Sequence, residues 1–138
     1  MMDAAVYGQS HARVHTILVV EDEVLIRLYL AEELRHAGFT VSEASTADEA
    51  CTILAAGMKV DLVLTDIRMP GSMDGVALAS WIRAKFPNTK ICFVSANIRP
   101  DDASLADANF SKPFQLNELL RKVGQLLPEV EQSSAAKG

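Results

Sequence analysis

The side chains of Glu21, Asp22, Asp66, Ser95 and Lys112 could share one reactive site. Three are carboxylates, one is a hydroxyl and one is an ammonium. Carboxylates that crowd together repel one another, and a divalent cation or a retained proton relieves that repulsion. Hard oxygen ligands with room for water favour Mg²⁺ over softer metals. These residue types predict a magnesium site beside a hydroxyl and a positive charge.

These polar residues follow four of five short, mostly apolar runs. The runs cover residues 16–20, 40–44, 61–65, 90–94 and 108–111. Three runs are apolar without alternation, which is typical of strands covered on both faces. The runs alternate with longer stretches of helical period. The sequence therefore predicts the βα alternation of a parallel sheet.

The stretches between the runs carry apolar residues at helical spacing. Thr46 and Glu49 form a capping-box pair before the second stretch, and Gly38 and Gly57 end the first two. We expect an α/β three-layer sandwich whose right-handed crossovers bring every strand's carboxyl end to one edge. The periodic residues are Ile26, Leu30, Leu34, Ala50, Ile53, Leu54, Leu78, Ile82, Phe86, Leu116, Leu119, Leu120, Val123 and Leu127.

Each polar residue also has an ordinary structural interpretation. Asp22 could cap a helix, Asp66 could close an Asx-turn, and Ser95 could cap the segment after it. Lys112 could be a solvated loop charge. Taken together these interpretations are weaker, because all of the residues fall at the same end of the predicted strands.

Composition and charge narrow the function classes. The chain has 138 residues, of which 49% are hydrophobic, and 13 Lys+Arg against 18 Asp+Glu give a net charge of −5. A chain of this length can bury one core without disulfides or metals. Because the net charge is negative and the basic residues are interspersed with acidic ones, we expect no direct binding to nucleic acid.

The sequence shows neither a membrane-spanning segment nor a secretory signal. The longest aliphatic run, residues 17–20, is far shorter than the ~20 residues of a membrane span, and no secretory leader is visible. We therefore expect no membrane partner and a cytoplasmic location. The domain is predicted at residues 16–127, between flexible tails at 1–15 and 128–138. Cys51 and Cys92 are interpreted as core residues.

Four motifs resemble the receiver domain of two-component response regulators. They are ILVVEDE from residue 17, LTDIRMP from residue 64 followed by Asp74-Gly75, FVSA from residue 93, and SKPF from residue 111. The resemblance spans most of the chain. It implies a flavodoxin-like (βα)5 fold with a five-stranded parallel sheet in the order 2-1-3-4-5.

The resemblance also implies roles for the site residues. Asp66 would be the phosphoacceptor, and Asp22 and Asp66 would bind Mg²⁺ directly. Glu21 would bind the metal directly or through water, and the backbone carbonyl of Arg68 would be a further ligand. Lys112 and Ser95 would contact the phosphoryl group. The product would be an aspartyl phosphate, so the chain would be a phosphoryl acceptor rather than a turnover enzyme.

The implied donor is a phosphohistidine on a sensor histidine kinase or on a histidine phosphotransfer protein. Phosphorylation would shift the loops that carry Ser95 and Lys112 and so change a protein-interaction surface. Arg68 and Asn97 would flank the water that hydrolyses the acyl phosphate. The downstream protein target, and the choice between relay, phosphate sink and output, stay open.

The sequence departs from the receiver pattern near its fifth strand. Asn109 stands where receivers usually carry Tyr or Phe, and Phe110 follows one place later. Because strand side chains alternate, either the register shifts by one or the aromatic switch is absent. Ser95 and Lys112 are only 112 − 95 = 17 residues apart, and Pro100 lies between them. We expect a fourth helix that is short or replaced by a loop, and hence a monomer when unphosphorylated.

Two rival functions remain open at this stage. One is a phosphorylation-independent interaction module. The presence of all five site residues argues against it, and Asn109 keeps it open. The other is a Mg²⁺-dependent phosphatase that uses the same acidic edge. Phosphatases of the haloacid dehalogenase type carry a second Asp two places after the first, whereas this chain has Arg68 there. The acceptor function is the better prediction.

Overall fold

Five parallel strands form a single sheet in a computed structural model that describes residues 14–128. The strand order is β2-β1-β3-β4-β5, which confirms the predicted order and the flavodoxin-like class. The strands are β1 (Thr16–Val20), β2 (Thr40–Ala44), β3 (Leu62–Thr65), β4 (Lys90–Ser95) and β5 (Ala108–Ser111). Three of them have the predicted bounds.

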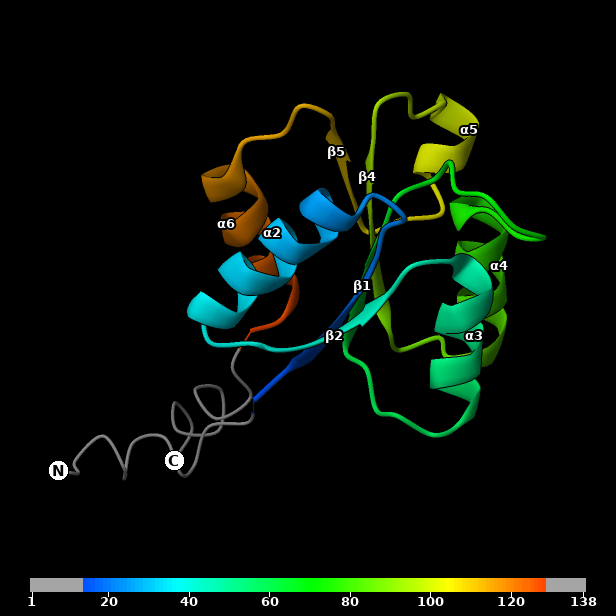
Figure 1. Ribbon diagram of the computed structural model, residues 1–138, viewed down its shortest axis with the longest axis horizontal. Coiled ribbons are helices and arrows are strands. Elements are labelled where there is room, and N and C mark those ends of the chain that lie inside the picture. The colour runs from blue at the N-terminus through cyan, green and yellow to red at the C-terminus, as the bar shows by residue number, and fades with distance from the viewer. Residues whose placement is uncertain (1–13, 129–138) are drawn as a thin grey trace, which may run out of the picture.

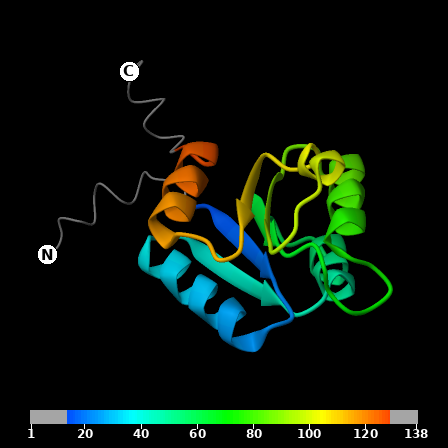
Figure 2. The ribbon, with the colours of Figure 1, turned by 90° about the horizontal axis from the view of Figure 1, so that it is seen from above.

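Helices cover both faces of the sheet (Figures 1 and 2). They are α2 (Val24–His36), α3 (Ala47–Ala55), α4 (Gly75–Lys85), α5 (Pro100–Ala103) and α6 (Leu116–Leu126). Figure 2 places α2 and α6 on one side of the sheet and α3, α4 and α5 on the other. The result is the predicted three-layer sandwich.

Alternation along the central strands builds one core on each face. Ile17 and Val19 of β1 join the cluster under α2 and α6, while Leu18 and Val20 join the cluster under α3 and α4. All four side chains are buried. A strand buried on both faces needs apolar residues at every position, which explains the unbroken run in the sequence. Because both clusters contain β1, the two cores fix its carboxyl end.

Local signals set the helix ends. The Thr46 side chain accepts a hydrogen bond from the Glu49 backbone N–H at 3.0 Å, so the predicted cap of α3 is correct. The Glu49 carboxylate reaches back to Ser45 rather than to Thr46, so the capping box is not reciprocal as predicted. Gly38 and Gly57 follow α2 and α3 with positive φ, the conformation that glycine adopts without strain.

The fourth helix of the βα series is a single short turn, as predicted. It is α5, which contains four residues, begins at Pro100 and buries none of its side chains. Proline fits the first turn of a helix because its missing N–H is not needed there. Without an apolar face, the segment has nothing to hold a longer helix on the sheet.

Both cysteines were predicted to be core residues. Cys92 is fully buried in β4, and burial raises the pKa of its thiol to about 12. Cys51 is only half-buried, and burial raises the pKa of its thiol as well. Both thiols therefore stay protonated at neutral pH, where they act as small apolar groups.

The ends of the described chain meet at the amino-terminal edge of β1. His15 is buried, and its Nε2 atom lies 3.2 Å from the carbonyl oxygen of Pro128. The predicted tails otherwise lie outside the described residues. Within residues 14–128 no helix is long and apolar enough to cross a membrane.

Candidate functional site

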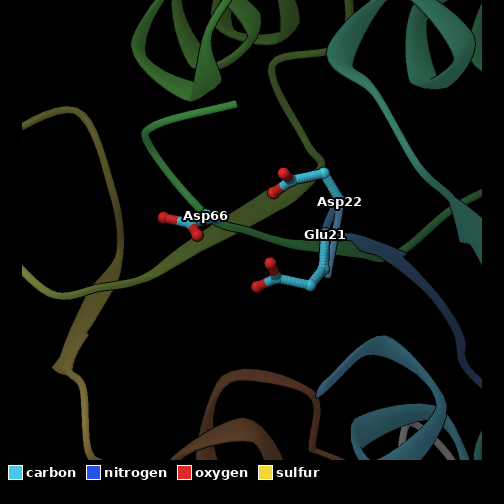
Figure 3. Close-up of side chains that lie close together, drawn as sticks. All are labelled: Glu21, Asp22 and Asp66. Atoms are coloured by element: carbon cyan, nitrogen blue, oxygen red, sulfur yellow. The ribbon is translucent and has the colours of Figure 1, made fainter. Parts of the chain in front are cut away.

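Three carboxylates gather where β1 and β3 end. Glu21 and Asp22 follow β1, and Asp66 follows β3 on the neighbouring strand. One oxygen from each residue lies within 4.8 Å of the other two. Figure 3 shows the three side chains reaching in the same direction from the two strand ends. The parallel sheet thus brings together residues that are 44 or more positions apart, as predicted.

Lys112 lies among these carboxylates. Its ammonium donates to Asp66 Oδ2 at 2.8 Å and to Glu21 Oε1 at 3.1 Å. Glu23 Oε1 lies 3.8 Å from the same nitrogen. The side chain of Lys112 is 17% exposed, so it is not the solvated loop charge of the ordinary interpretation. Its positive charge neutralises part of the negative charge of the carboxylates.

Burial and neighbouring charges have opposite effects on the pKa of the Lys112 ammonium. Burial alone lowers the pKa of the Lys112 ammonium, but its hydrogen bonds to Asp66 and Glu21 outweigh that effect and raise the pKa. Burial raises the pKa of the Glu21 carboxyl; hydrogen bonds from the Glu23 backbone and from Lys112 oppose this, while the charge of Asp66 adds to it. Lys112 is therefore held firmly in its charged form.

The backbone around Asp66 aims its carboxylate toward Lys112. Asp66 Oδ1 accepts from the backbone N–H groups of Ile67 at 2.7 Å and Arg68 at 3.3 Å. This is the turn expected from the ordinary interpretation, and it coexists with the bond to Lys112. The hydroxyl of Thr65 donates to the Asp66 carbonyl at 2.8 Å. Local hydrogen bonds thus fix both the side chain and the carbonyl group of Asp66.

Asp22 has no structural task that would explain it. The residue at the start of α2 is Glu23, whose side chain makes no capping bond, so Asp22 is not the helix cap. The Asp22 carboxylate forms no hydrogen bond or ion pair with the described residues. It is more exposed than Glu21 and Asp66, which are buried. A free carboxylate beside two others fits the hard oxygen donor set that Mg²⁺ prefers.

Two further predicted residues lie beside this cluster. Ser95 ends β4 and is 2% exposed, and its hydroxyl forms no hydrogen bond with the described residues. Asn97 and Arg68 are exposed and line a hollow of about 360 Å³ together with Arg99 and Asp102. The loops after β3 and β4 therefore bring Arg68 and Asn97 to the same hollow.

Comparison with known proteins decides the family. The profile of the response regulator receiver domain matches residues 17–124, which is most of the chain. The protein belongs to the receiver domain family. Its place in two-component signalling follows from this membership, and the sequence-based recognition is confirmed.

Individual relatives agree with this assignment. The chain is 38% identical over 118 residues to the sensor kinase CckA of Brucella abortus, covering 81% of this chain and 12% of the kinase. It is 37% identical over 116 residues to the transcriptional regulatory protein PrrA of Mycobacterium leprae, covering 80% of this chain and 49% of that regulator. The chain thus spans half or less of these relatives.

A solved structure also matches closely. The response regulator TrrA of Thermotoga maritima, in complex with Mg²⁺–BeF, is 38% identical with a TM-score of 0.77. The match covers 83% of this chain and all of that one. The receiver fold of this protein is therefore shared with a relative whose structure contains magnesium.

The receiver's fifth strand, β5, pairs with β4 in parallel. Phe93 pairs with Asn109 and Val94 with Phe110. Asn109 points away from the cluster under α2 and α6. Its Nδ2 atom donates to the Ala103 carbonyl in α5 at 3.1 Å. Phe110 packs on the opposite face, against the cluster under α2 and α6. Three places before Lys112, this face of β5 therefore presents the Asn109 amide rather than an aromatic side chain.

Sequence analysis missed an apolar surface on α2 of this receiver. Val24, Leu25, Leu28 and Tyr29 are between 47% and 81% exposed, with Leu25 the most exposed. They lie on the side of the helix away from Leu30 and Leu34, which are buried. The sequence signal was available, because these residues are apolar outside the predicted core positions. We call this set the α2 patch.

Proposed function

We propose that Asp66 accepts a phosphoryl group from the phosphohistidine of a sensor histidine kinase or a histidine phosphotransfer protein. The observation that carries this proposal is the Asp66 carboxylate, held 2.8 Å from the Lys112 ammonium and within 4.8 Å of two other carboxylates. Such a group can attack phosphorus and can also share a cation. Because the phosphoryl group stays on Asp66 after the transfer, we expect a phosphoryl acceptor rather than a turnover enzyme.

The cluster suits Mg²⁺ as the cation. Asp22 and Asp66 would bind it directly, Glu21 directly or through water, and the Arg68 backbone carbonyl would complete the protein ligands. Bound there, the metal supplies positive charge that draws electrons from the incoming phosphoryl group and aligns it for displacement. The complex of the related TrrA with Mg²⁺–BeF supports this assignment.

The chain's own residues divide the remaining work. An oxygen of Asp66 forms the new P–O bond while the P–N bond to the donor imidazole breaks, and the imidazole leaves with the electron pair. Lys112 moves its hydrogen bond from Asp66 Oδ2 to a phosphoryl oxygen. Ser95 donates its unused hydroxyl to another phosphoryl oxygen. Arg68 and Asn97 border the approach of the water that later hydrolyses the product.

A protein donor is supported by the α2 patch. Helix α2 begins directly after Glu23, so the patch lies next to the acidic edge. Apolar side chains that remain this exposed mark interaction surfaces more often than ordinary surface. A kinase or phosphotransfer protein would cover the patch while it presents its phosphohistidine to Asp66. We place this exchange in the cytoplasm.

Labelling with a small phosphodonor tests the acceptor directly. Incubation with acetyl phosphate and Mg²⁺ should add the mass of one phosphoryl group to the intact protein. A chelator should abolish the mass gain, because the donor's charge is then uncompensated. Asp66→Asn should also abolish it, whereas equal modification of the Asn variant would contradict the acceptor assignment.

Controls in the same assay separate the rival functions. Sustained hydrolysis of a phosphate ester by the purified protein would favour a phosphatase. Absence of any mass gain with Mg²⁺ present would favour a phosphorylation-independent interaction module.

The oligomeric state gives an independent prediction. Receivers that pair through the fourth helix need an apolar face there, and α5 buries none of its four side chains. We expect the unphosphorylated protein to sediment as a monomer. A tight dimer in sedimentation velocity, without donor, would contradict this expectation.

A further inference from the structure

The start of α4 is pressed against the backbone of the acceptor residue. A Cβ atom added to Gly75 would lie 2.0 Å from the Asp66 carbonyl oxygen and 2.7 Å from the Ile67 Cα. The Gly75 N–H already donates to the Ile67 carbonyl at 2.7 Å. Side chains essentially never approach backbone atoms so closely, so no residue with a Cβ fits this contact without displacement.

The need for glycine comes from space rather than from backbone conformation. Gly38, Gly57 and Gly71 have positive φ, and Gly75 does not. Alanine could therefore adopt the Gly75 backbone, and its intrinsic helix propensity is higher than that of glycine. Any loss caused by alanine here must come from the contact with Asp66 and Ile67.

Helix α4 cannot easily move away to relieve such a clash. Its residues Leu78, Ala79 and Ile82 are fully buried in the core under α3 and α4. The Asp74 side chain caps the helix by accepting from the Ala77 N–H at 2.9 Å. The helix start is therefore anchored on both sides of Gly75.

Because α4 is anchored, the clash would be relieved by a shift of the acceptor backbone. This backbone is held by the bond from the Asp66 N–H to the Val20 carbonyl at 3.1 Å and by the Thr65 hydroxyl. Both bonds, as well as the 2.8 Å bond from Lys112 to Asp66 Oδ2, would be strained if the Asp66 peptide moved. A displaced peptide would carry its carboxylate out of the shared site.

We propose that Gly75 is a positioning residue for phosphoryl transfer, which keeps the Asp66 carboxylate in reach of Lys112, Glu21 and Asp22. The inference rests on the proposed function, because it assumes that Asp66 is the acceptor. Displacement by about 1 Å can reduce the rate of a positioned reaction on the order of 100-fold. Gly75 thus acts through Asp66 and does not touch the donor.

The test compares Gly75→Ala with Gly124→Ala, which is the matched control. Gly124 lies in α6, where an added Cβ meets no atom within 4 Å. With acetyl phosphate and Mg²⁺, Gly75→Ala should label at least tenfold more slowly than the wild type and should bind Mg²⁺ at least several-fold more weakly. Gly124→Ala should match the wild type in both measurements.

A third variant separates positioning from general destabilisation. Val123→Ala removes a buried side chain from α6, far from the contact, and lowers stability without touching Asp66. It should label at the wild-type rate per folded molecule, even where its thermal midpoint is as low as that of Gly75→Ala. Equal slowing of both variants would overturn the positioning role.

A measurement on the wild type covers the case in which Gly75→Ala does not fold. On labelling with acetyl phosphate, the Gly75 amide resonance should shift strongly, and the Gly124 amide should not. An unmoved Gly75 amide on a labelled protein would overturn the inference while leaving the acceptor function intact. If the wild type itself takes no label, the proposed function fails first.

Discussion

Two halves of the carboxyl edge of the sheet differ in how their side chains are held. In the acceptor half, after β1 and β3, Asp66 and Glu21 are buried and bound to Lys112. In the response half, between β4 and β5, the Ser95 hydroxyl has no partner among the described residues and α5 is one turn long. Side-chain bonds thus tie the strand ends of the acceptor half together, whereas the Ser95 hydroxyl makes no such bond to the described residues of the response half.

The difference separates the two proposed tasks of the domain. The acceptor half carries the residue types that the proposed transfer needs. In the response half, the Asn109 side chain donates to the Ala103 carbonyl of α5. We therefore expect substitutions in the acceptor half to change the transfer itself, and substitutions in the response half to change how the transfer is reported.

Among the substitutions that test this comparison, removal of the Lys112 ammonium should have the largest effect. Lys112→Ala leaves Glu21 and Asp66 without compensation, which should lower stability by about 1–3 kcal/mol in the absence of metal. Mg²⁺ should restore much of that loss and should bind more tightly than in the wild type. Thermal unfolding with and without Mg²⁺ measures both effects.

The same variant tests whether Lys112 couples the two halves. We expect Lys112→Ala to keep some labelling of Asp66, at about a tenth of the wild-type rate, because the nucleophile remains. Its response-half amides should no longer shift on labelling. A wild-type pattern of amide shifts in the labelled variant would refute the coupling role.

Loss of the Ser95 hydroxyl should have a smaller effect, confined to the response half. Ser95→Ala removes a group without a hydrogen bond among the described residues, so stability should change by less than about 0.5 kcal/mol. Labelling should slow only a few-fold, since Lys112 is intact. Amide shifts in the loop after β4 should shrink on labelling. A fully retained loop response would show that Ser95 does not sense the phosphoryl group.

The smallest effect is expected at Asn109. Asn109→Ala removes the bond to the Ala103 carbonyl, which should cost less than about 1 kcal/mol because the site is exposed. Amide hydrogen exchange in α5 should become faster. The labelling rate of Asp66 should stay the same, because Asn109 is outside the acceptor half. A large change in that rate would mean that the two halves are not separate.

Sequence analysis could predict the acceptor half because its determinants are local or topological. Unbroken apolar runs predicted β1 and β3, and parallel strands must present their carboxyl ends at one edge. The approach of Asp66 to Glu21 and Lys112 followed from these two facts. The short α5 was predictable as well, from Pro100 and the missing apolar period.

Contacts between helices and strands could not be predicted from the sequence. The close approach of Gly75 to Asp66 depends on how α4 seats on its core, which no local pattern encodes. The partner of Glu49 depends on the conformation of Ser45, so the capping-box spacing alone gave the wrong donor. The α2 patch was overlooked because only the periodic residues of this helix were considered, although a helix has one buried face and its other apolar residues must then be exposed.

The contact between His15 and Pro128 has a consequence for how such a domain can be used. It brings the beginning of β1 and the end of α6 together at the edge opposite Asp66. A unit whose two ends are neighbours can be spliced into a longer polypeptide at a single point, and the junction then lies remote from the chemistry. Swapping the module between host proteins should therefore leave its reactive carboxylate undisturbed.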